Sequence, residues 1–252
     1  MFKNIKPPVD ISTFGHYIDS LFNYITVMNI IYLVLVCIGI FGFSFLYSRK
    51  RNPTPTYTHG NKKKQIWTVT LLASSVFFAI DMYITSKSNN DMINVFWNFP
   101  DYKKENVLRV QILAQQWMWN IRYAGKDGVF NTADDIVTNN DLRIPTNTKV
   151  YAQITSKDVI HAFYLPNYRI KADAMPGRIS RLWFETRDGI TGEYDIACAE
   201  MCGTHHYLMK AKLTVYTKEE FDRWMSQSQQ YAFSGNDTEN PDTFWGWKWE
   251  SK

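Results

Sequence analysis

The stretch from Cys198 to Lys210, "CAEMCGTHHYLMK", holds two of the chain's three cysteines, a glutamate, two adjacent histidines and two methionines. Thiol, imidazole and thioether groups at such short spacing suit four kinds of structure: a disulfide, a zinc site, a mononuclear copper site or a dinuclear copper site. Each makes a different demand on its ligands, so the composition of the loop discriminates among them.

A disulfide between Cys198 and Cys202 would close a loop too short to restrict the unfolded chain strongly, and it has no use for the histidines and methionine. Zinc accepts two thiolates and two imidazoles, but a thioether is a soft ligand that suits copper better. A blue-copper centre uses one cysteine, whereas this loop has two. Two thiolates can each bridge two metal ions, so the loop favours dinuclear copper, with the disulfide and zinc readings left open.

The second imidazole of such a site has to come from another segment. His161, in "KDVIHAF", lies on a predicted strand upstream of the cysteine loop, and a Greek-key barrel can bring two distant segments to one end. A single histidine on a strand is more often a packed core residue. His161 is therefore a candidate ligand only in combination with the cysteine loop.

Two long apolar runs predict a transmembrane hairpin with helices at about 24–47 and 66–85. Each run reaches the roughly 20 residues needed to cross a hydrocarbon layer of about 30 Å. A buried core helix is the alternative, and it is stronger for the second run, which several Ser and Thr residues dilute. The loop between them, "SRKRNPTPTYTHGNKKK", carries six basic residues, which indicates that it faces the cytoplasm. Much of the formal net charge of +4 comes from this loop, so the charge does not indicate a nucleic-acid partner.

Beyond the hairpin, short alternating segments rich in β-branched and aromatic residues predict a β-sandwich or barrel on the opposite side of the membrane. The stretch "TKEEFDRWMSQSQQ" predicts a helix, because Thr217 and Glu220 form a capping box. The chain then divides into residues 1–90 with the hairpin, 91–216 with the β-domain, and 217–252 with a C-terminal helix and an aromatic-rich tail. The predicted strands cover 107–125, 148–156, 158–166, 180–187, 192–198 and 208–216.

Taken together, these motifs resemble subunit II of the haem–copper oxidases, whose loop reads C-x-E-x-C-G-x-x-H-x-x-M. The resemblance extends over nearly the whole chain, through "IWT", "QWMWNIRY", "DVIHAF" and "IKADAMPGR". It implies a two-helix transmembrane hairpin followed by a cupredoxin-like Greek-key β-barrel with a dinuclear copper centre, CuA. Matched by position, the copper ligands would be His161, Cys198, Glu200 through its backbone carbonyl, Cys202, His206 and Met209.

The resemblance also implies roles for residues around the centre. The Glu200 side chain would reach a magnesium ion at the border with subunit I, and Trp117 would be the point of electron entry, whereas Trp119 is better explained by core packing. Lys171, Asp173 and Arg178 would form a polar network beside the haem propionates of subunit I, with a solvated turn as the alternative reading.

The function implied by the resemblance is that of an electron inlet in a cytochrome c oxidase. Cytochrome c, or a membrane c-haem subunit, would reduce the copper centre, and subunit I would reduce dioxygen to water. This chain would have no catalytic residue and, lacking a C-x-x-C-H motif, no covalent haem. It would lie in a bacterial inner membrane with other oxidase subunits, and its copper domain would face the periplasm.

Two departures from the family pattern leave other readings open. Lys64 stands where relatives often carry a glutamate at a proton entry, which slightly favours the copper subunit of a nitric oxide reductase. The β-domain has no dense acidic surface for docking a basic cytochrome. Its acidic loop is interpreted as a solvated turn, with a docking site for the cytochrome or a calcium site as alternatives. The acidic residues of this loop are Asp127, Asp134, Asp135 and Asp141. A membrane-anchored copper-delivery protein is the alternative from another functional class.

Overall fold

The computed structural model describes residues 7–54, 57, 59–103, 106–130, 132 and 134–232. The chain divides into two compact units, one spanning Tyr17–Trp97 and the other combining the segment up to His16 with the chain from Asn98 onward. The segment that precedes the first helix thus belongs with the second unit, although the whole helical hairpin separates the two in sequence.

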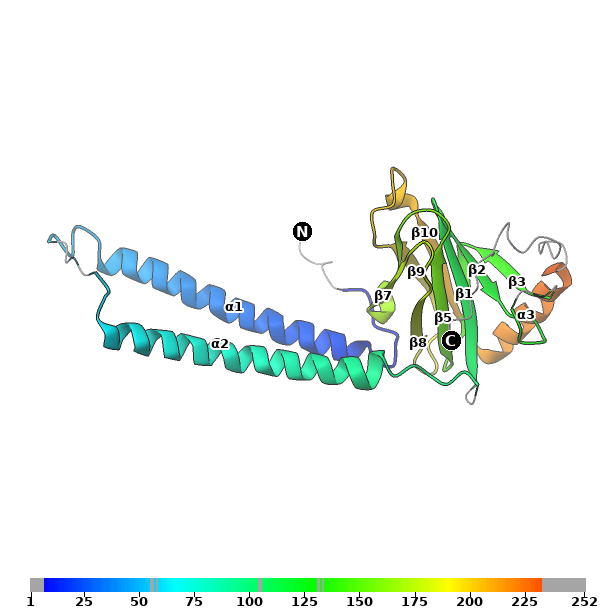
Figure 1. The fold of residues 1–252 in the computed structure, drawn as a ribbon, viewed down its shortest axis with the longest axis horizontal. Helices are drawn as coiled ribbons and strands as arrows, with labels where there is room; N and C mark the ends of the chain where they lie inside the picture. The colour runs from blue at the N-terminus through cyan, green and yellow to red at the C-terminus, as the bar shows by residue number, and fades with distance from the viewer. Residues whose placement is uncertain are drawn as a thin grey trace. The chain divides into compact units, whose positions relative to one another are not determined.

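The first unit consists of helices α1 (Gly15–Leu46) and α2 (Lys63–Asp91). Helix α2 continues into a π-helical turn at Met92–Phe96. The two helices run side by side (Figure 1), and aromatic pairs join them, Tyr24 with Tyr83 and Tyr32 with Phe77. At 32 residues α1 is about 48 Å long, more than the hydrocarbon thickness of a membrane. Both helices are long and apolar enough to span a membrane, as the sequence predicts.

The first helix begins at Gly15, well before the predicted start at residue 24, because a polar motif caps its end. The backbone N–H of Gly15 donates to Ser12 Oγ at 2.6 Å, and Ser12 donates from N and Oγ to Asp10. A side chain at position 15 would collide with Asp10 and Ser12, so this close approach requires glycine. A hydropathy pattern does not detect such a cap, so the predicted helix starts later than the observed one.

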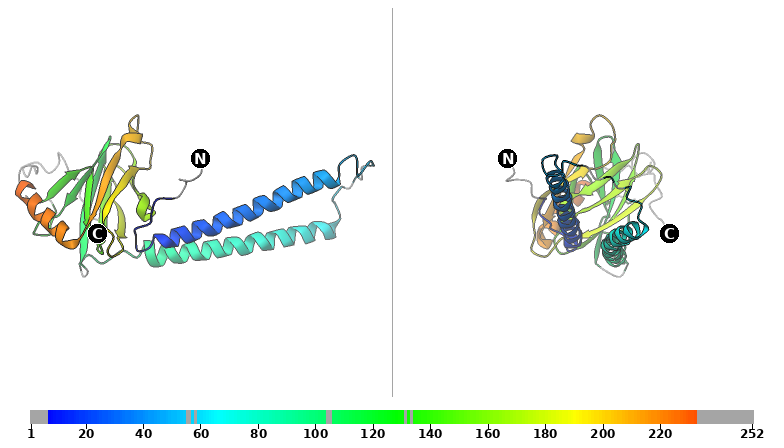
Figure 2. Two further views of the ribbon diagram at one scale, coloured as in Figure 1. Left: turned by 180° about the vertical axis from the view of Figure 1, so that it is seen from behind. Right: turned by 90° about the vertical axis from the view of Figure 1, so that its left-hand side faces the viewer.

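The second unit is a two-sheet β-domain (Figure 2) of the cupredoxin-like class, which confirms the predicted fold class. One sheet has the order β3-β2-β1-β5-β8, and the other has the order β4-β10-β9-β6-β7. Each sheet contains one parallel pair, β1 with β5 and β10 with β4. The strands are β1 (Val107–Gln115), β2 (Met118–Tyr123), β3 (Ile136–Asn139), β4 (Asp141–Pro145), β5 (Lys149–Ser156), β6 (His161–Leu165), β7 (Ile170–Ala174), β8 (Ser180–Glu185), β9 (Gly192–Cys198) and β10 (Lys210–Tyr216).

Alternating side chains of the two sheets fill the space between them. On β2 the inward residues Trp119, Ile121 and Tyr123 are fully buried, and Phe163 of β6 packs against Trp119 with ring centroids 5.1 Å apart. Because successive strand side chains point to opposite faces, this register fixes which side chains lie at the end of each strand. The metal-ligating candidates lie at such strand ends.

The predicted strand over residues 107–125 is wrong as a single element, because the structure forms a hairpin there. β1 and β2 pair from Gln115↔Met118 to Val110↔Tyr123, and Gln116 and Trp117 form the turn. Three strands, β3, β4 and β7, were also not predicted. They are only four or five residues long and contain Asn, Asp, Lys or Arg, so their alternation is too short to stand out from a polar loop.

The four acidic residues of the predicted loop serve separate local roles. Asp135 is 1% exposed beside the buried Arg122 at 3.6 Å, so the solvated-turn reading is wrong for this residue. Asp127 and Asp134 cap turns, and Asp141 pairs with an arginine two positions on. Among the described residues, the one group of three or more His, Cys, Asp or Glu side chains that could share an ion lies elsewhere.

The C-terminal helix α3 (Lys218–Ala232) begins at the predicted capping box. Thr217 N donates to a Glu220 carboxylate oxygen at 3.0 Å, and Glu220 N donates to Thr217 Oγ1 at 3.3 Å, which confirms this prediction. Trp224 of the helix packs on Tyr123. The predicted tail over residues 233–252, with its three tryptophans, lies outside the described residues.

The segment before α1 forms part of the β-domain. Ile11 exchanges backbone hydrogen bonds with Asn167 and Arg187, and Thr13 N donates to Glu185 O at 3.1 Å. Ile11 is 1% exposed and Phe14 is 3% exposed, and the Phe14 ring lies 5.1 Å from that of Trp183. Residues 8–14 thus extend the edge of β8 and complete the apolar core on that side.

Replacing Phe14 with alanine is expected to destabilise the β-domain by about 3 kcal/mol, because the change removes a buried ring and leaves a cavity. Denaturant unfolding of the detergent-solubilised chain, followed by tryptophan fluorescence, measures this loss. Phe22→Ala is the matched control, since Phe22 lies on α1 and is 66% exposed. Equal midpoints for the two variants would show that residues 8–14 contribute nothing to the domain.

Candidate metal centre

Two neighbouring strands and one loop position the candidate ligands. His161 begins β6 and Cys198 ends β9, and these antiparallel strands pair at Phe163↔Cys198. The loop that follows Cys198 returns to β10, where Cys198 N donates to Met209 O at 3.1 Å. A short 3₁₀ turn at His206–Leu208 shapes the end of this loop, so the whole cysteine loop closes over the end of β6.

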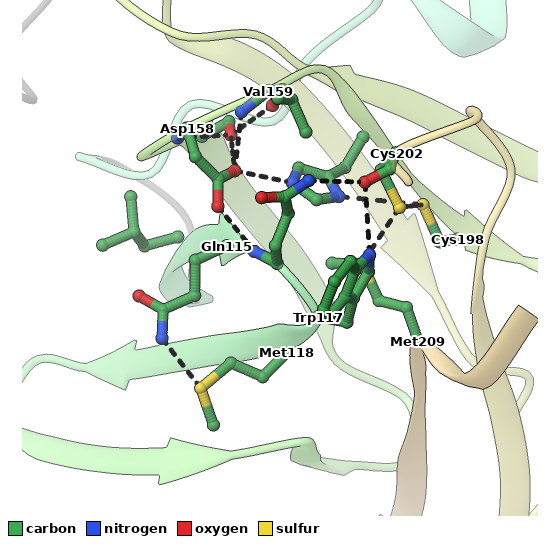
Figure 3. Close-up of polar contacts among 12 residues, drawn as sticks. Gln115, Trp117, Met118, Asp158, Val159, Cys198, Cys202 and Met209 are labelled. Carbon is green, nitrogen blue, oxygen red and sulfur yellow. Dashed lines mark hydrogen bonds and ion pairs between the residues drawn. The ribbon is translucent and has the colours of Figure 1, made fainter. Parts of the chain in front are cut away.

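The side chains converge through a chain of short contacts (Figure 3). The Sγ atoms of Cys198 and Cys202 lie 3.8 Å apart, and His161 Nδ1 lies 4.0 Å from Cys198 Sγ. On the other side, Cys202 Sγ lies 3.4 Å from His206 Nδ1 and 3.8 Å from Met209 Sδ. Each sulfur therefore has its own imidazole neighbour, and the thioether adjoins the second sulfur.

Glu200 contributes its backbone and its side chain in different directions. Its carbonyl oxygen lies 3.2 Å from Cys198 Sγ, whereas the residue as a whole is exposed. The carbonyl is therefore placed beside the sulfur pair, and the carboxylate remains available at the surface.

The two cysteines are free thiols in this structure. A disulfide bond is about 2.05 Å long, so a sulfur separation of 3.8 Å excludes a covalent link here. Metal–thiolate distances are about 2.3 Å, and one ion can therefore contact both sulfur atoms across this gap. Donors of three residues, His161, Cys198 and Cys202, lie within 4.8 Å of one another, which fits a soft metal ion.

The electrostatics of the metal-free pair point to one proton held between two sulfurs. Burial, the largest single influence, would raise the pKa of Cys198, but the hydrogen-bonding contacts with His161, with Cys202 and with nearby backbone groups together lower it to about 6. Burial and the neighbouring Cys198 raise the pKa of Cys202 to about 12. A bound cation would offset the cost of a second buried thiolate and displace that proton.

The β1–β2 turn packs directly on the cysteine loop. The carbonyl of Cys202 accepts hydrogen bonds from Gln116 Nε2 at 2.8 Å and from Trp117 Nε1 at 3.2 Å. Gly203 has a φ of +117°, and an added Cβ would lie 3.1 Å from Gln116 Nε2 and 3.2 Å from the Trp117 ring. Glycine is thus required where the loop backbone passes over Trp117.

The two adjacent histidines point to different partners. His206 Nδ1 faces the Cys202 sulfur, whereas the His205 ring contacts Trp117 in an edge-to-face arrangement with centroids 4.4 Å apart. His205 Nδ1 also lies 3.2 Å from Thr204 Oγ1. Trp119 is fully buried, with its ring against Phe163 and 6.1 Å from His161, which confirms the core-packing prediction for this residue.

The predicted polar network lies on the surface at the end of the second sheet. Lys171 and Asp173 of β7 are 3.7 Å apart and about half exposed, and Asp173 pairs in register with Ala162, next to His161. Arg178 is exposed in the turn after β7. These side chains are therefore near the strand that carries a ligand, on an edge that a partner can reach.

Sequence reasoning missed two residues that hold the site together, Asp158 and Gln116. Asp158 Oδ1 accepts a hydrogen bond from His161 Nε2 at 2.9 Å, and Asp158 Oδ2 accepts one from Gln116 N at 2.6 Å. The only signal in the sequence is position, since Asp158 precedes His161 by three residues and Gln116 precedes Trp117 directly.

Fold and donor set together define a cupredoxin-like domain with a site for soft metal ions at the ends of its strands. Residues 108–215 match the family model described as "Cytochrome C oxidase subunit II, periplasmic domain". The β-domain of this chain is therefore similar to the periplasmic domain of cytochrome c oxidase subunit II.

Individual proteins are also similar to parts of this chain. The chain is 34% identical over 145 residues to "Alternative cytochrome c oxidase subunit 2" of Bradyrhizobium diazoefficiens, covering 49% of this chain and 52% of the relative. It is 28% identical over 186 residues to "Cytochrome c oxidase subunit 2" of Rhipicephalus sanguineus, covering 67% and 75%. The periplasmic domain of subunit II of Bradyrhizobium japonicum, a solved structure, matches with a TM-score of 0.44 and 27% identity over 49% of this chain and 94% of that one. The matched region spans about half the length of the first of these relatives.

Proposed function

We propose that this β-domain holds a dinuclear copper centre and that the chain is the electron-entry subunit of a cytochrome c oxidase. The observation that carries the proposal is the pairing of each thiol with its own imidazole. Cys198 adjoins His161, Cys202 adjoins His206, and the two sulfurs lie 3.8 Å apart. Two bridging thiolates, each flanked by one terminal nitrogen ligand, provide a nearly symmetric donor set for two ions rather than one.

The remaining ligands complete two unequal positions. Met209 would supply a thioether on the Cys202 side, and the Glu200 carbonyl would supply an oxygen on the Cys198 side. Copper in such a site would carry one electron at a time, shared between two ions. The protein's contribution is rigidity, because Cys202 and Met209 are buried and backbone hydrogen bonds close the loop at both ends.

Trp117 is the proposed entry point for electrons. Its ring is half-buried, and its Nε1 donates directly to the carbonyl of Cys202, so a donor at this surface would be a few bonds from a ligand sulfur. The donor would be a cytochrome c or a c-haem subunit of a larger assembly. Relatives with oxidase names support a respiratory partner, and haem in a subunit I would receive the electron.

The surface residues fit roles at the border with that partner. The exposed Glu200 carboxylate would hold a magnesium ion there, and Lys171, Asp173 and Arg178 would face the haem propionates. The apolar helices would anchor the chain in a bacterial inner membrane, with the basic loop in the cytoplasm and the copper domain in the periplasm. Dioxygen reduction would take place in the partner.

A nitric oxide reductase is the second candidate, because Lys64 occupies the first turn of α2 as an exposed cation. A lysine there cannot collect protons as a carboxylate would. Turnover of the intact complex with dioxygen or with nitric oxide separates these two enzymes. A copper-delivery protein fits the burial of the site poorly, since handing over copper is easier from exposed ligands, and Cys202 is 3% exposed.

Trp117→Ala is expected to slow reduction of the copper centre by reduced cytochrome c at least tenfold while copper content stays unchanged. The substitution removes the aromatic ring between the surface and the Cys202 carbonyl but no proposed ligand. Stopped-flow absorbance of the copper-loaded chain measures the rate.

Trp224→Ala serves as the control for this experiment, since Trp224 lies on α3 against Tyr123 and outside the site. It should transfer electrons at the rate of the unmodified chain. Equal rates for both tryptophan variants would place electron entry elsewhere on the domain.

A further inference from the structure

The carboxylate of Asp158 makes several hydrogen bonds beside the site, although Asp158 is not a proposed ligand. It lies in the loop between β5 and β6. Its Oδ1 accepts hydrogen bonds from His161 Nε2 at 2.9 Å and from Val159 N at 2.6 Å, and Ser156 Oγ lies 3.3 Å from the same oxygen. Its Oδ2 accepts a hydrogen bond from Gln116 N at 2.6 Å. Figure 3 shows the carboxylate between these segments.

These contacts fix the tautomer of His161. An ionised carboxylate accepts hydrogen bonds and donates none, so the ring nitrogen that faces it, Nε2, must carry the hydrogen. The lone pair of the neutral ring then lies on Nδ1, which is the nitrogen 4.0 Å from Cys198 Sγ. His161 is fully buried, so water cannot take the place of Asp158 as the partner of Nε2.

The second oxygen connects the same carboxylate to the proposed entry point for electrons. The Gln116 N–H that it accepts belongs to the β1–β2 turn, and two side chains of this turn, Gln116 and Trp117, donate to the Cys202 carbonyl. The turn is therefore held on one side by Asp158 and on the other by the cysteine loop. Movement of the carboxylate would disturb His161 and Trp117 together.

We propose that Asp158 is the positioning residue of this centre. Its carboxylate presents His161 Nδ1 to the sulfur pair and holds the Gln116–Trp117 turn against Cys202. The consequence for copper rests on the proposed function, whereas the tautomer is a property of the metal-free protein. The two can therefore be tested separately.

Asp158→Asn is the variant that separates the carboxylate's hydrogen bonding from its size. All the backbone and ring nitrogens around Asp158 are donors, and an amide can accept only through its one oxygen. Its NH₂ group must face either Gln116 N–H or the His161 ring, where it favours the opposite tautomer. We expect His161 to lose the pure Nε2–H form and copper to bind at least tenfold more weakly.

The test is ¹⁵N NMR of the metal-free full chain in detergent, labelled at histidine and assigned with a His161→Gln variant, followed by copper titration against a chelator. Asp188→Asn, an exposed turn residue, should match the unmodified chain in both readouts. Asp158→Glu, which restores a carboxylate, should return the Nε2–H tautomer. Near-ultraviolet circular dichroism reports whether each variant folds.

Three results would overturn the proposal: Nδ1–H as the main form in the unmodified chain, an unchanged tautomer in Asp158→Asn, or an altered tautomer with undiminished copper affinity. If Asp158→Asn does not fold, the spectrum of the unmodified chain and that of Asp158→Glu still decide the tautomer. An unmodified chain that binds no copper would instead overturn the proposed function, and the tautomer result would remain readable.

Discussion

Replacement of Cys202 by serine is expected to abolish binding of the second copper ion and reduce copper content to one ion per chain or less. A hydroxyl of similar size fills the buried position but cannot bridge two ions as a thiolate does. Loss of this sulfur also removes the common neighbour of His206, Met209 and Cys198. Metal analysis and electron paramagnetic resonance of the copper-loaded variant measure the effect.

Cys37→Ser provides the matched control, because Cys37 is a free thiol on α1 and outside the β-domain. This variant should bind copper with the stoichiometry and spectrum of the unmodified chain. Copper binding that survives Cys202→Ser in full, or that falls equally in Cys37→Ser, would contradict a centre built on the Cys198–Cys202 pair.

The second large effect is expected from the adjacent histidines, which should behave in opposite ways. His206→Ala should lose the copper spectrum, because His206 Nδ1 is the nitrogen 3.4 Å from Cys202 Sγ. His205→Ala should keep that spectrum and change the fluorescence of Trp117, which the His205 ring contacts edge to face. Visible absorbance and tryptophan emission of the two variants, measured side by side, check both expectations.

Each histidine variant is the control for the other, since the two differ by one position in the same exposed loop. A reversed result, with the spectrum lost in His205→Ala and kept in His206→Ala, would require the loop to rearrange when metal binds. The assignment of His206 would then be wrong.

The resemblance to a family motif selected the candidate ligands of the cysteine loop, because their spacing matches that motif. Cys198, Cys202, His206 and Met209 lie within twelve residues, and one tight loop closed by β9 and β10 brings them together. His161 is different, because its position beside Cys198 depends on the pairing of β6 with β9. The residues around His161 do not predict that pairing, and His161 was selected as a candidate ligand through the resemblance to a family.

The hairpin and the two-sheet domain were predictable because apolar length and alternation are strong signals. The short polar strands β3, β4 and β7 were not, since their pairing with neighbours outweighs weak local patterns. The roles of Asp158 and residues 8–14 also depend on contacts between distant segments. Ile11, for example, bonds to Asn167 and Arg187 across more than 150 positions, a separation that no local window covers.

Copper stoichiometry combined with electron paramagnetic resonance tests the central claim most directly. The full chain, purified in detergent and loaded with copper, is expected to bind two ions and to give the seven-line hyperfine pattern of one unpaired electron shared by two copper nuclei. One ion per chain with a four-line pattern, or a covalent sulfur–sulfur link between Cys198 and Cys202 that prevents loading, would contradict the dinuclear centre.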